Sequence, residues 1–211
     1  MKRIVVFSLL AGCVALAADD TTGMMFDQQL TSAQKEIVPL VEAMPDDQMN
    51  FAPASGEFKG VRSFSLQAMH VGAVLYMVSA GILGEKVPID VGTSENGPAA
   101  MTSKAEVVKY LNDAFVYAHK AMTSLTAQNL TASVKSPFGG GETQRGSLAV
   151  INVSHVLDHY GQMAVYARMK GSCLRRADGN FTRYVLLVKP ESMKIGEQKS
   201  ELERGHHGLR R

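Results

Sequence analysis

The sequence predicts an all-α protein, a bundle of four helices formed by residues 25–171. Two observations support this fold class. Apolar residues recur at helical steps of three and four in four separate stretches, and segments rich in Gly, Pro and Ser separate these stretches. We expect helices at 26–44, 61–83, 103–126 and 147–170, because apolar faces with this spacing are buried against one another in a bundle.

The first predicted helix, residues 26–44, has one apolar face that includes Leu30, Ile37 and Met44. Pro39 interrupts this pattern. Proline has no amide hydrogen, so we expect either a kink at Pro39 or a second helical segment that begins there.

The second predicted helix, residues 61–83, carries His70 in the middle of a broad apolar face. A single histidine in such a position is more often a hydrogen-bonded core residue than a ligand. The following residues, 84–100, have no periodicity and are rich in Gly, Pro, Ser and Asn. Loops of this length usually have a function. We therefore expect this linker to lie over one end of the bundle and to cover a pocket.

The third predicted helix, residues 103–126, begins with a capping box in which Ser103 and Glu106 satisfy the first free amides. His119 flanks its apolar face, and we interpret it as a structural or surface residue. After this helix, a Pro-Phe-Gly-Gly-Gly turn separates residues 132–135 from 142–145, which predicts a short hairpin. The glycine run lacks the Gly-Lys-Ser/Thr ending of a phosphate-binding loop.

The fourth predicted helix, residues 147–170, contains His155 and His159 on one face. Residues four apart lie on consecutive turns, roughly 40° apart around the helix axis, so both imidazoles can point at one atom. Two ligands from one helix bind a metal in this way. The pair alone also fits two hydrogen-bonded core histidines.

Residues 1–17 have the pattern of a signal peptide. Lys2-Arg3 is a basic start, residues 4–10 form an apolar run too short to span a bilayer, and Ala15-Leu16-Ala17 is a typical cleavage site. We therefore expect an exported protein, periplasmic or extracellular, without a transmembrane helix.

The two cysteines support an alternative to simple secretion. Cys13 ends Leu10-Ala11-Gly12-Cys13, which resembles a bacterial lipobox, and a lipid anchor at Cys13 would make the protein a membrane-anchored lipoprotein. Cleavage after Ala17 instead leaves only Cys173, which excludes an internal disulfide. The formal net charge of +2 gives no nucleic-acid footprint, so we expect no nucleic-acid partner. The partner that we expect is a small-molecule substrate of unknown identity. A homodimer is also compatible with the sequence.

Several of these pieces resemble the DinB-like superfamily. They are Val61-Arg62-Ser63-Phe64 followed by Met69-His70-Val71, and the later run from Ser154 to Gln162, which reads Ser-His-Val-Leu-Asp-His-Tyr-Gly-Gln. The resemblance extends over roughly residues 25–171 and also includes Ile37-Val38-Pro39-Leu40 and Met44-Pro45. The order and spacing of the three histidines is its most specific part.

The resemblance implies a four-helix bundle with an up-down-down-up arrangement and a divalent metal, most often zinc or nickel, at one end. Carried over residue by residue, the metal ligands are His70, His155 and His159. Such a site keeps an open coordination position for water, a thiolate or a substrate oxygen. Characterised relatives include thiol-dependent transferases and isomerases. Candidates for hydrogen bonding to the ligands are Gln67, Asp158 and Gln162.

Two functions follow from this interpretation. One is an exported metal-dependent enzyme, a transferase or a hydrolase, and the alternative is a non-catalytic bundle that binds a metal or another ligand. A ferritin-like di-metal centre needs Glu-x-x-His pairs on two helices, and none of the four predicted helices contains such a pair. A b-type cytochrome with His and Met axial ligands is compatible with the twelve methionines, but a c-type haem motif is absent. Residues 172–211 form a C-terminal extension without a matching amphipathic helix, and His206-His207 is interpreted as a solvated terminus.

Overall fold

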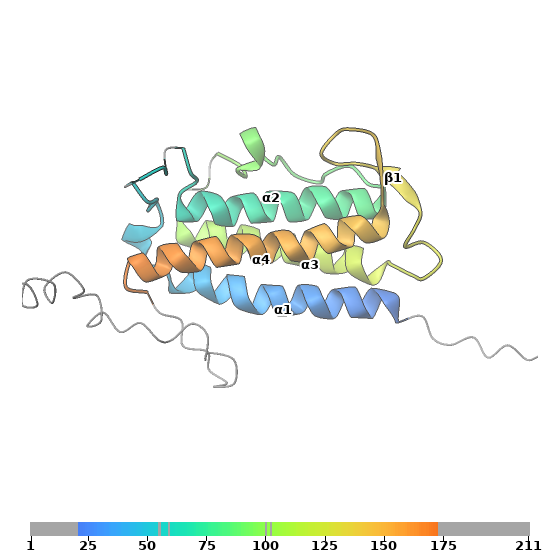
Figure 1. Ribbon diagram of the computed structural model, residues 1–211, viewed down its shortest axis with the longest axis horizontal. Coiled ribbons are helices and arrows are strands. Elements are labelled where there is room, and N and C mark those ends of the chain that lie inside the picture. The colour runs from blue at the N-terminus through green and yellow to red at the C-terminus, as the bar shows by residue number, and fades with distance from the viewer. Residues whose placement is uncertain (1–20, 55, 59, 100, 102, 173–211) are drawn as a thin grey trace, which may run out of the picture. The chain divides into compact units, whose positions relative to one another are not determined.

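The computed structural model describes residues 21–54, 56–58, 60–99, 101 and 103–172, and four long helices dominate them (Figure 1). The all-α four-helix prediction is therefore confirmed. The signal peptide predicted at residues 1–17, the lipobox at Cys13 and residues 173–211 of the predicted extension lie outside the described residues. The helices are α1 (Thr22–Ala43), α2 (Phe64–Leu83), α3 (Lys104–Thr123) and α4 (Arg145–Met169). The short elements are η1 (Asp46–Gln48), η2 (Thr93–Glu95), β1 (Ser133–Lys135) and β2 (Glu142–Gln144).

The helices have the up-down-down-up arrangement that the family resemblance implies. In Figure 1, α1 and α4 run in one direction along the bundle, whereas α2 and α3 run in the other. Helix α2 packs against α3 and α4, and α1 packs against the same two helices. As a result α2 and α4 are antiparallel neighbours, and their facing sides form one wall of the bundle.

The linker between α2 and α3 lies along the side of α2, so the expectation that it covers one end of the bundle is wrong. Helices α2 and α3 point the same way, and the chain must return along the whole bundle between them (Figure 1). Within this return segment, η2 packs against α2, and a Cβ added to Gly97 would lie 3.1 Å from the Cβ of Met69. The linker thus places polar loop residues beside the first half of α2.

The helix boundaries differ from the sequence prediction by up to four residues. Helix α2 begins at Phe64 rather than at residue 61, because the Ser63 side chain caps it by accepting a hydrogen bond from the Leu66 amide. Helix α1 begins at Thr22 and continues through Pro39. Pro39 and Lys35 are both exposed, so the carbonyl that loses its amide partner lies on the solvent side of the helix.

Two local predictions are confirmed. The Ser103 side chain accepts from the Glu106 amide while the Glu106 carboxylate accepts from the Ser103 amide, which completes the capping box of α3. Strands β1 and β2 pair antiparallel, with Val134 opposite Thr143. The hairpin thus connects α3 to α4 at the end of the bundle away from the start of α2 (Figure 1).

Helix α2 is the central element of the hydrophobic core. Fifteen of its 20 residues are buried, including Phe64, Leu75 and Ile82. In the described part of the chain it is also the one helix long and apolar enough to cross a membrane, but 78% of that apolar window is buried inside the bundle. Burial on all sides is typical of the core helix of a globular domain, and such helices have the same length and apolar composition as membrane-spanning helices.

Lys104 joins the start of α3 to the end of α1. Its ammonium donates to the carbonyls of Glu42 and Met44, at 3.3 and 3.1 Å, and pairs with Asp46 at 2.6 Å. A cation at this position satisfies free carbonyls and interacts favourably with the helix dipole.

We therefore predict that Lys104→Met lowers the free energy of unfolding by about 1–2 kcal/mol in urea titrations followed by circular dichroism. Lys109→Met is the matched control, because Lys109 pairs only with Asp113 four residues along the exposed face of the same helix. Its loss should change the stability by about 0.5 kcal/mol or less. Equal effects of the two substitutions would contradict the role given to Lys104.

Candidate metal centre

The structure brings the three histidines predicted as ligands into one cluster. His70 lies on α2, and His155 and His159 lie on α4. Their ring centroids are 5.0 Å apart for His70 and His155, 4.9 Å for His70 and His159, and 4.5 Å for His155 and His159. One ring nitrogen from each lies within 4.8 Å of the others, so the three side chains can hold one metal ion.

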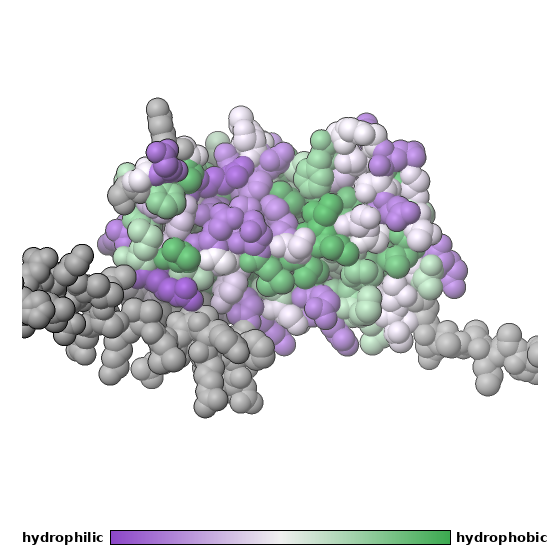
Figure 2. Space-filling model, viewed as in Figure 1, coloured by the Kyte–Doolittle hydropathy of each residue, from purple (hydrophilic) through white to green (hydrophobic). Residues whose placement is uncertain are grey.

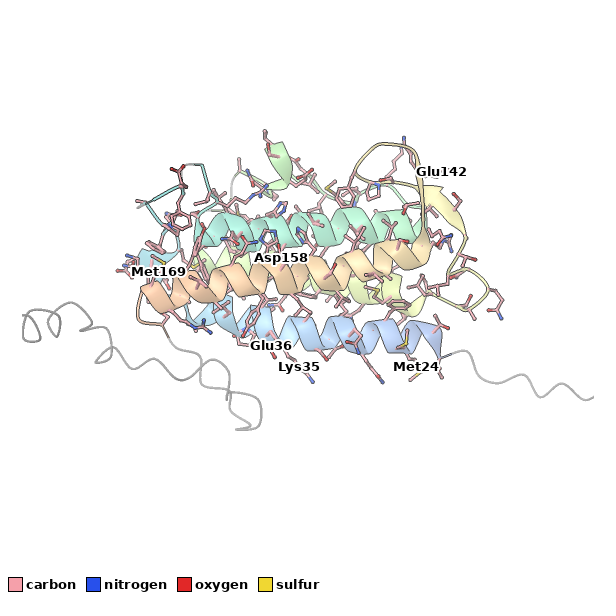
Figure 3. All side chains as sticks on the ribbon, in the orientation of Figure 1. Met24, Lys35, Glu36, Glu142, Asp158 and Met169 are labelled. Carbon is pink, nitrogen blue, oxygen red and sulfur yellow. The ribbon has the colours of Figure 1, made fainter. Side chains whose placement is uncertain are left out.

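The antiparallel packing of α2 and α4 produces this cluster. His155 and His159 lie one turn apart and face α2, where His70 occupies the second turn after the capped start at Ser63. Figure 3 shows the labelled Asp158, between the two histidines in sequence, where α4 runs beside α2. The cluster therefore lies where α2 and α4 pack together, about 9 Å of helix from the start of α2, rather than at the very end of the bundle.

Hydrogen bonds fix the orientation of two of the three rings. Nδ1 of His70 donates to the backbone carbonyl of Glu95, at 2.9 Å, and Nδ1 of His159 donates to Oε1 of Gln67, at 3.1 Å. Since a neutral imidazole carries one proton, both rings present an unprotonated Nε2. Second hydrogen bonds of this kind usually orient histidine ligands of a metal.

The third ring, that of His155, lacks such a partner. Its Nε2 lies 3.2 Å from Nε2 of His70, and its Nδ1 is buried without a hydrogen-bond partner. In either neutral tautomer, one buried nitrogen of His155 therefore stays unsatisfied or faces the lone pair of His70. Unsatisfied buried polar groups are costly, so this arrangement is unfavourable without a cation.

The donor geometry fits a divalent metal. Two imidazole nitrogens bound to one zinc ion at about 2.0–2.1 Å with a tetrahedral angle lie about 3.3 Å apart. The observed separation between the Nε2 atoms of His70 and His155 is 3.2 Å. This pair thus already has the spacing that a shared ion requires, and the candidate ligand atoms of all three histidines lie within 4.8 Å of one another.

The environment keeps these histidines neutral. Burial, together with the neighbouring His159 and His70, lowers the pKa of His155 to about 3. Burial, together with His70, likewise lowers the pKa of His159 to about 4, although the Asp158 carboxylate opposes the shift. Burial also lowers the pKa of His70, against the opposing effect of its hydrogen bond to Glu95. Neutral imidazole is the form that binds metals.

His119 lies outside the cluster, as the sequence interpretation expected. Its Nδ1 is 2.6 Å from a carboxylate oxygen of Asp27, and its Nε2 is 2.9 Å from Oε1 of Gln34. Both partners belong to α1, whereas His119 belongs to α3. This histidine therefore joins two helices of the bundle.

Among the three residues predicted to hydrogen-bond the ligands, Gln67 is the one that does so. It contacts both His159 and the Tyr166 hydroxyl, so it connects a candidate ligand to a second residue on α4. Asp158 accepts instead from Gln162, at 3.0 Å. Asp158 affects the cluster only through its charge, which raises the pKa of His159.

A pocket of about 490 Å³ opens beside the cluster. It lies between the segment that precedes α2, the linker around η2, and the second half of α4. Figure 2 shows hydrophilic surface gathered over the groove between the first half of α2 and α4, with hydrophobic surface over the later half of α2. The pocket is lined by Gly60, Val61, Arg62, Gln67, Ser94, Asn96, His159, Gln162 and Tyr166.

Three features of the site were not predicted as functional from the sequence. Tyr166 lies seven residues after His159, and this spacing on α4 was a usable signal. Arg62 belongs to a segment that contributes to the family resemblance, although no role was assigned to it. The role of the Glu95 carbonyl could not be predicted from the sequence, because the position of a backbone acceptor in an aperiodic loop depends on the tertiary structure.

The fold and the cluster together define the class of the protein: an up-down-down-up four-helix bundle with three histidines arranged to hold a metal on its α2–α4 wall. The family model of the DinB superfamily matches residues 29–163. The chain therefore belongs to the DinB superfamily.

Solved structures show the same fold. A DinB-like protein from Bacillus cereus superposes with a TM-score of 0.58 at 18% sequence identity, over 72% of this chain and 94% of the other. A DinB-like protein from Bacillus subtilis gives a TM-score of 0.55 at 15% identity, over 72% of this chain and 95% of the other. At these identities the likeness supports the fold alone. None of the curated proteins matches the chain.

We predict that Gln67→Leu lowers the free energy of unfolding by about 1–3 kcal/mol in metal-free buffer, because it leaves the buried N–H of His159 without an acceptor. The matched control is Gln162→Leu, since Gln162 also lines the pocket but bonds only to Asp158. That substitution should stay within about 0.5 kcal/mol of the wild type. Urea unfolding of the two variants would contradict the prediction if it gave equal losses.

The lowered pKa values of the cluster predict that the stability of the metal-free protein depends on pH. Unfolded histidine has its ordinary pKa of 6.5, whereas His155 and His159 in the folded protein titrate at about 3 and 4. Between the folded-state pKa values and 6.5, the unfolded chain binds more protons than the folded chain. The free energy of unfolding therefore increases with pH in this range, and it decreases as the pH falls below 6.5.

Urea titrations at pH 5, 6 and 7 with a chelator present measure this dependence. His155→Gln should reduce the pH slope, because it removes one group that protonates only on unfolding. A slope that is unchanged in this variant would show that other groups cause the pH dependence.

Proposed function

We propose that the protein binds one divalent metal ion through His70, His155 and His159, and that the native ion is zinc or nickel. The observation that carries the proposal is the convergence of three neutral imidazoles, two of which have their Nδ1 atoms held by acceptors so that Nε2 faces the centre of the cluster. Imidazole nitrogen is a preferred ligand of both ions.

The surrounding residues provide an environment in which a bound ion can be used. When bound, a divalent ion on three histidines supplies a Lewis acid with a coordination position left open for water, a thiolate or a substrate oxygen. His159 forms part of the pocket wall, so a small molecule in the pocket reaches the cluster directly. The Tyr166 hydroxyl lines the same pocket and stays protonated at neutral pH, because burial raises its pKa.

We infer a metal-dependent transferase or hydrolase that acts on a small molecule. The pocket volume is within the range of about 300–1,000 Å³ that is usual for small-molecule sites. Tyr166 can donate a hydrogen bond or a proton to a ligand, because Gln67 occupies its oxygen as a donor and leaves the hydroxyl hydrogen free.

The alternative is a bundle that binds a metal or a ligand without catalysis. One observation favours it: the described residues that line the pocket include no carboxylate that could act as a general base. Two activity assays on the metal-loaded protein distinguish the enzyme from the binding protein. One uses small thiols with an alkylating electrophile as substrates, and the other uses activated esters. Turnover that His159→Ala abolishes supports the enzyme, whereas stoichiometric metal without turnover of any probe supports the binding protein.

We further propose that the protein is exported, on the basis of the signal-peptide pattern in residues 1–17. Mass spectrometry of the protein from a fractionated bacterial host tests this: cleavage after Ala17 indicates secretion, and a lipid-modified Cys13 indicates the membrane-anchored alternative. Uncleaved protein in the cytoplasm would contradict both.

The decisive prediction concerns metal content. Elemental analysis of protein purified without a polyhistidine tag should find about one divalent ion per chain. His155→Ala should lower metal affinity by about tenfold or more while circular dichroism still shows the four helices. His119→Ala is the matched control, since the ring of this histidine hydrogen-bonds to Asp27 and Gln34 of α1, outside the cluster, and it should retain the ion. Equal loss of metal in the two variants, or no metal in the wild type after incubation with zinc and nickel, would refute the site.

A further inference from the structure

Arg62 lies on the wall of the pocket, between the candidate metal centre and the linker. Of the described residues that line this pocket, it is the only arginine, lysine, aspartate or glutamate. Arg62 therefore adds positive charge to a site that has no carboxylate ligand.

The guanidinium of Arg62 is held in place by neutral groups. Its Nε donates to Oδ1 of Asn96, at 2.7 Å, and its Nη2 donates to the backbone carbonyl of Ser94, at 3.1 Å. A guanidinium has five N–H donors in a fixed plane, so three remain after these two bonds. The linker thus orients the side chain without neutralising it.

No carboxylate neutralises Arg62 within the described part of the chain. The ion pairs found there, Lys104–Asp46, Lys109–Asp113, His119–Asp27 and Lys120–Glu85, do not include Arg62. A partly buried cation without a counter-ion on a pocket wall is suited to binding an anionic ligand.

The start of α2 does not provide an alternative anion site. Its first amides already donate to other groups: Phe64 to the Phe51 carbonyl, Ser65 to the Met49 carbonyl and Leu66 to the Ser63 hydroxyl. The first amides of α2 are therefore not available to an anion in the pocket, whereas the N–H groups of Arg62 are charged donors among the residues that line it.

We propose that Arg62 binds the carboxylate of a small ligand whose other functional group faces the three histidines. A carboxylate matches the planar fork of a guanidinium with two parallel hydrogen bonds. This inference rests on the proposed metal-dependent function and deepens it, because it names the substrate class: a small carboxylic acid that also carries a group able to bind a metal.

Matched ligand pairs test this proposal. The probes are mercaptoacetate, 3-mercaptopropionate and 4-mercaptobutyrate, each compared with its neutral amide by calorimetry on the full-length zinc-loaded protein. The series varies the distance between the thiol and the carboxylate. At its best length, the wild type should bind the carboxylate about tenfold to hundredfold more tightly than the amide. Equal affinities for all three pairs would overturn the proposal.

Variants at Arg62 separate ligand binding from support of the linker. Arg62→Gln should abolish the preference for the carboxylate without changing the metal content, and Arg62→Lys should retain part of the preference. If Arg62→Gln instead loses the metal, Arg62 acts by positioning the Glu95 carbonyl against His70, and the proposal is overturned. Asn96→Ala is a second check, because it keeps the charge but removes one of the two bonds that orient it, so it should weaken the preference without abolishing it.

A metal-free arm distinguishes failure of this inference from failure of the proposed function. Elemental analysis first shows whether zinc is bound. Nuclear magnetic resonance titrations of the metal-free protein with butyrate and butyramide then test Arg62 alone. A carboxylate preference that is lost in Arg62→Gln supports this inference even where no metal binds, and the absence of that preference overturns it whatever the metal content.

Discussion

The contact between three imidazoles across α2 and α4 is the constraint on which the rest of the site depends. Two large polar rings on one helix and a third on its neighbour occupy positions that hydrophobic side chains would otherwise fill. Each ring has two nitrogens that need partners. The protein supplies two of these partners, Gln67 and the Glu95 carbonyl, and leaves the Nε2 atoms turned toward one another. The stability of the wall and its capacity to bind a cation are therefore determined by the same atoms.

The helix order explains how the partners reach the histidines. With α2 and α3 pointing the same way, the connection between them must run back along the bundle, and it does so along α2. The Glu95 carbonyl, Asn96 and the Ser94 carbonyl are thereby placed beside His70 and Arg62. A simple up-down-up-down bundle with short connections would offer no backbone at this position. The topology therefore contributes directly to the chemistry of the site.

Sequence reasoning identified what depends on local periodicity and missed what depends on distant contacts. The spacing of His155 and His159 and the capping box at Ser103 are consequences of helix geometry, so they could be predicted. His70 needed the family resemblance, because a single histidine on an apolar face is ambiguous. The Glu95 carbonyl and the role of Arg62 depend on a loop about thirty residues away from Arg62 in the sequence, which no periodicity describes. The start of α2 was predicted three residues early because the apolar pattern at Val61 outweighed the capping signal of Ser63.

The backbone at Ser94 and Glu95 has a consequence for how the site is prepared for a ligand. Both residues have positive φ angles, 54° and 52°, and neither is glycine. Such conformations cost about 1–3 kcal/mol each and persist only where surrounding contacts impose them. Here those contacts are the bonds from Arg62 and the tight turn in which a Cβ on Gly92 would lie 1.9 Å from the Gly97 carbonyl oxygen. The linker thus holds a carbonyl in a conformation that the free peptide avoids. The orientation of the His70 ring is consequently preorganised, so ligand binding does not carry the entropic cost of ordering this ring.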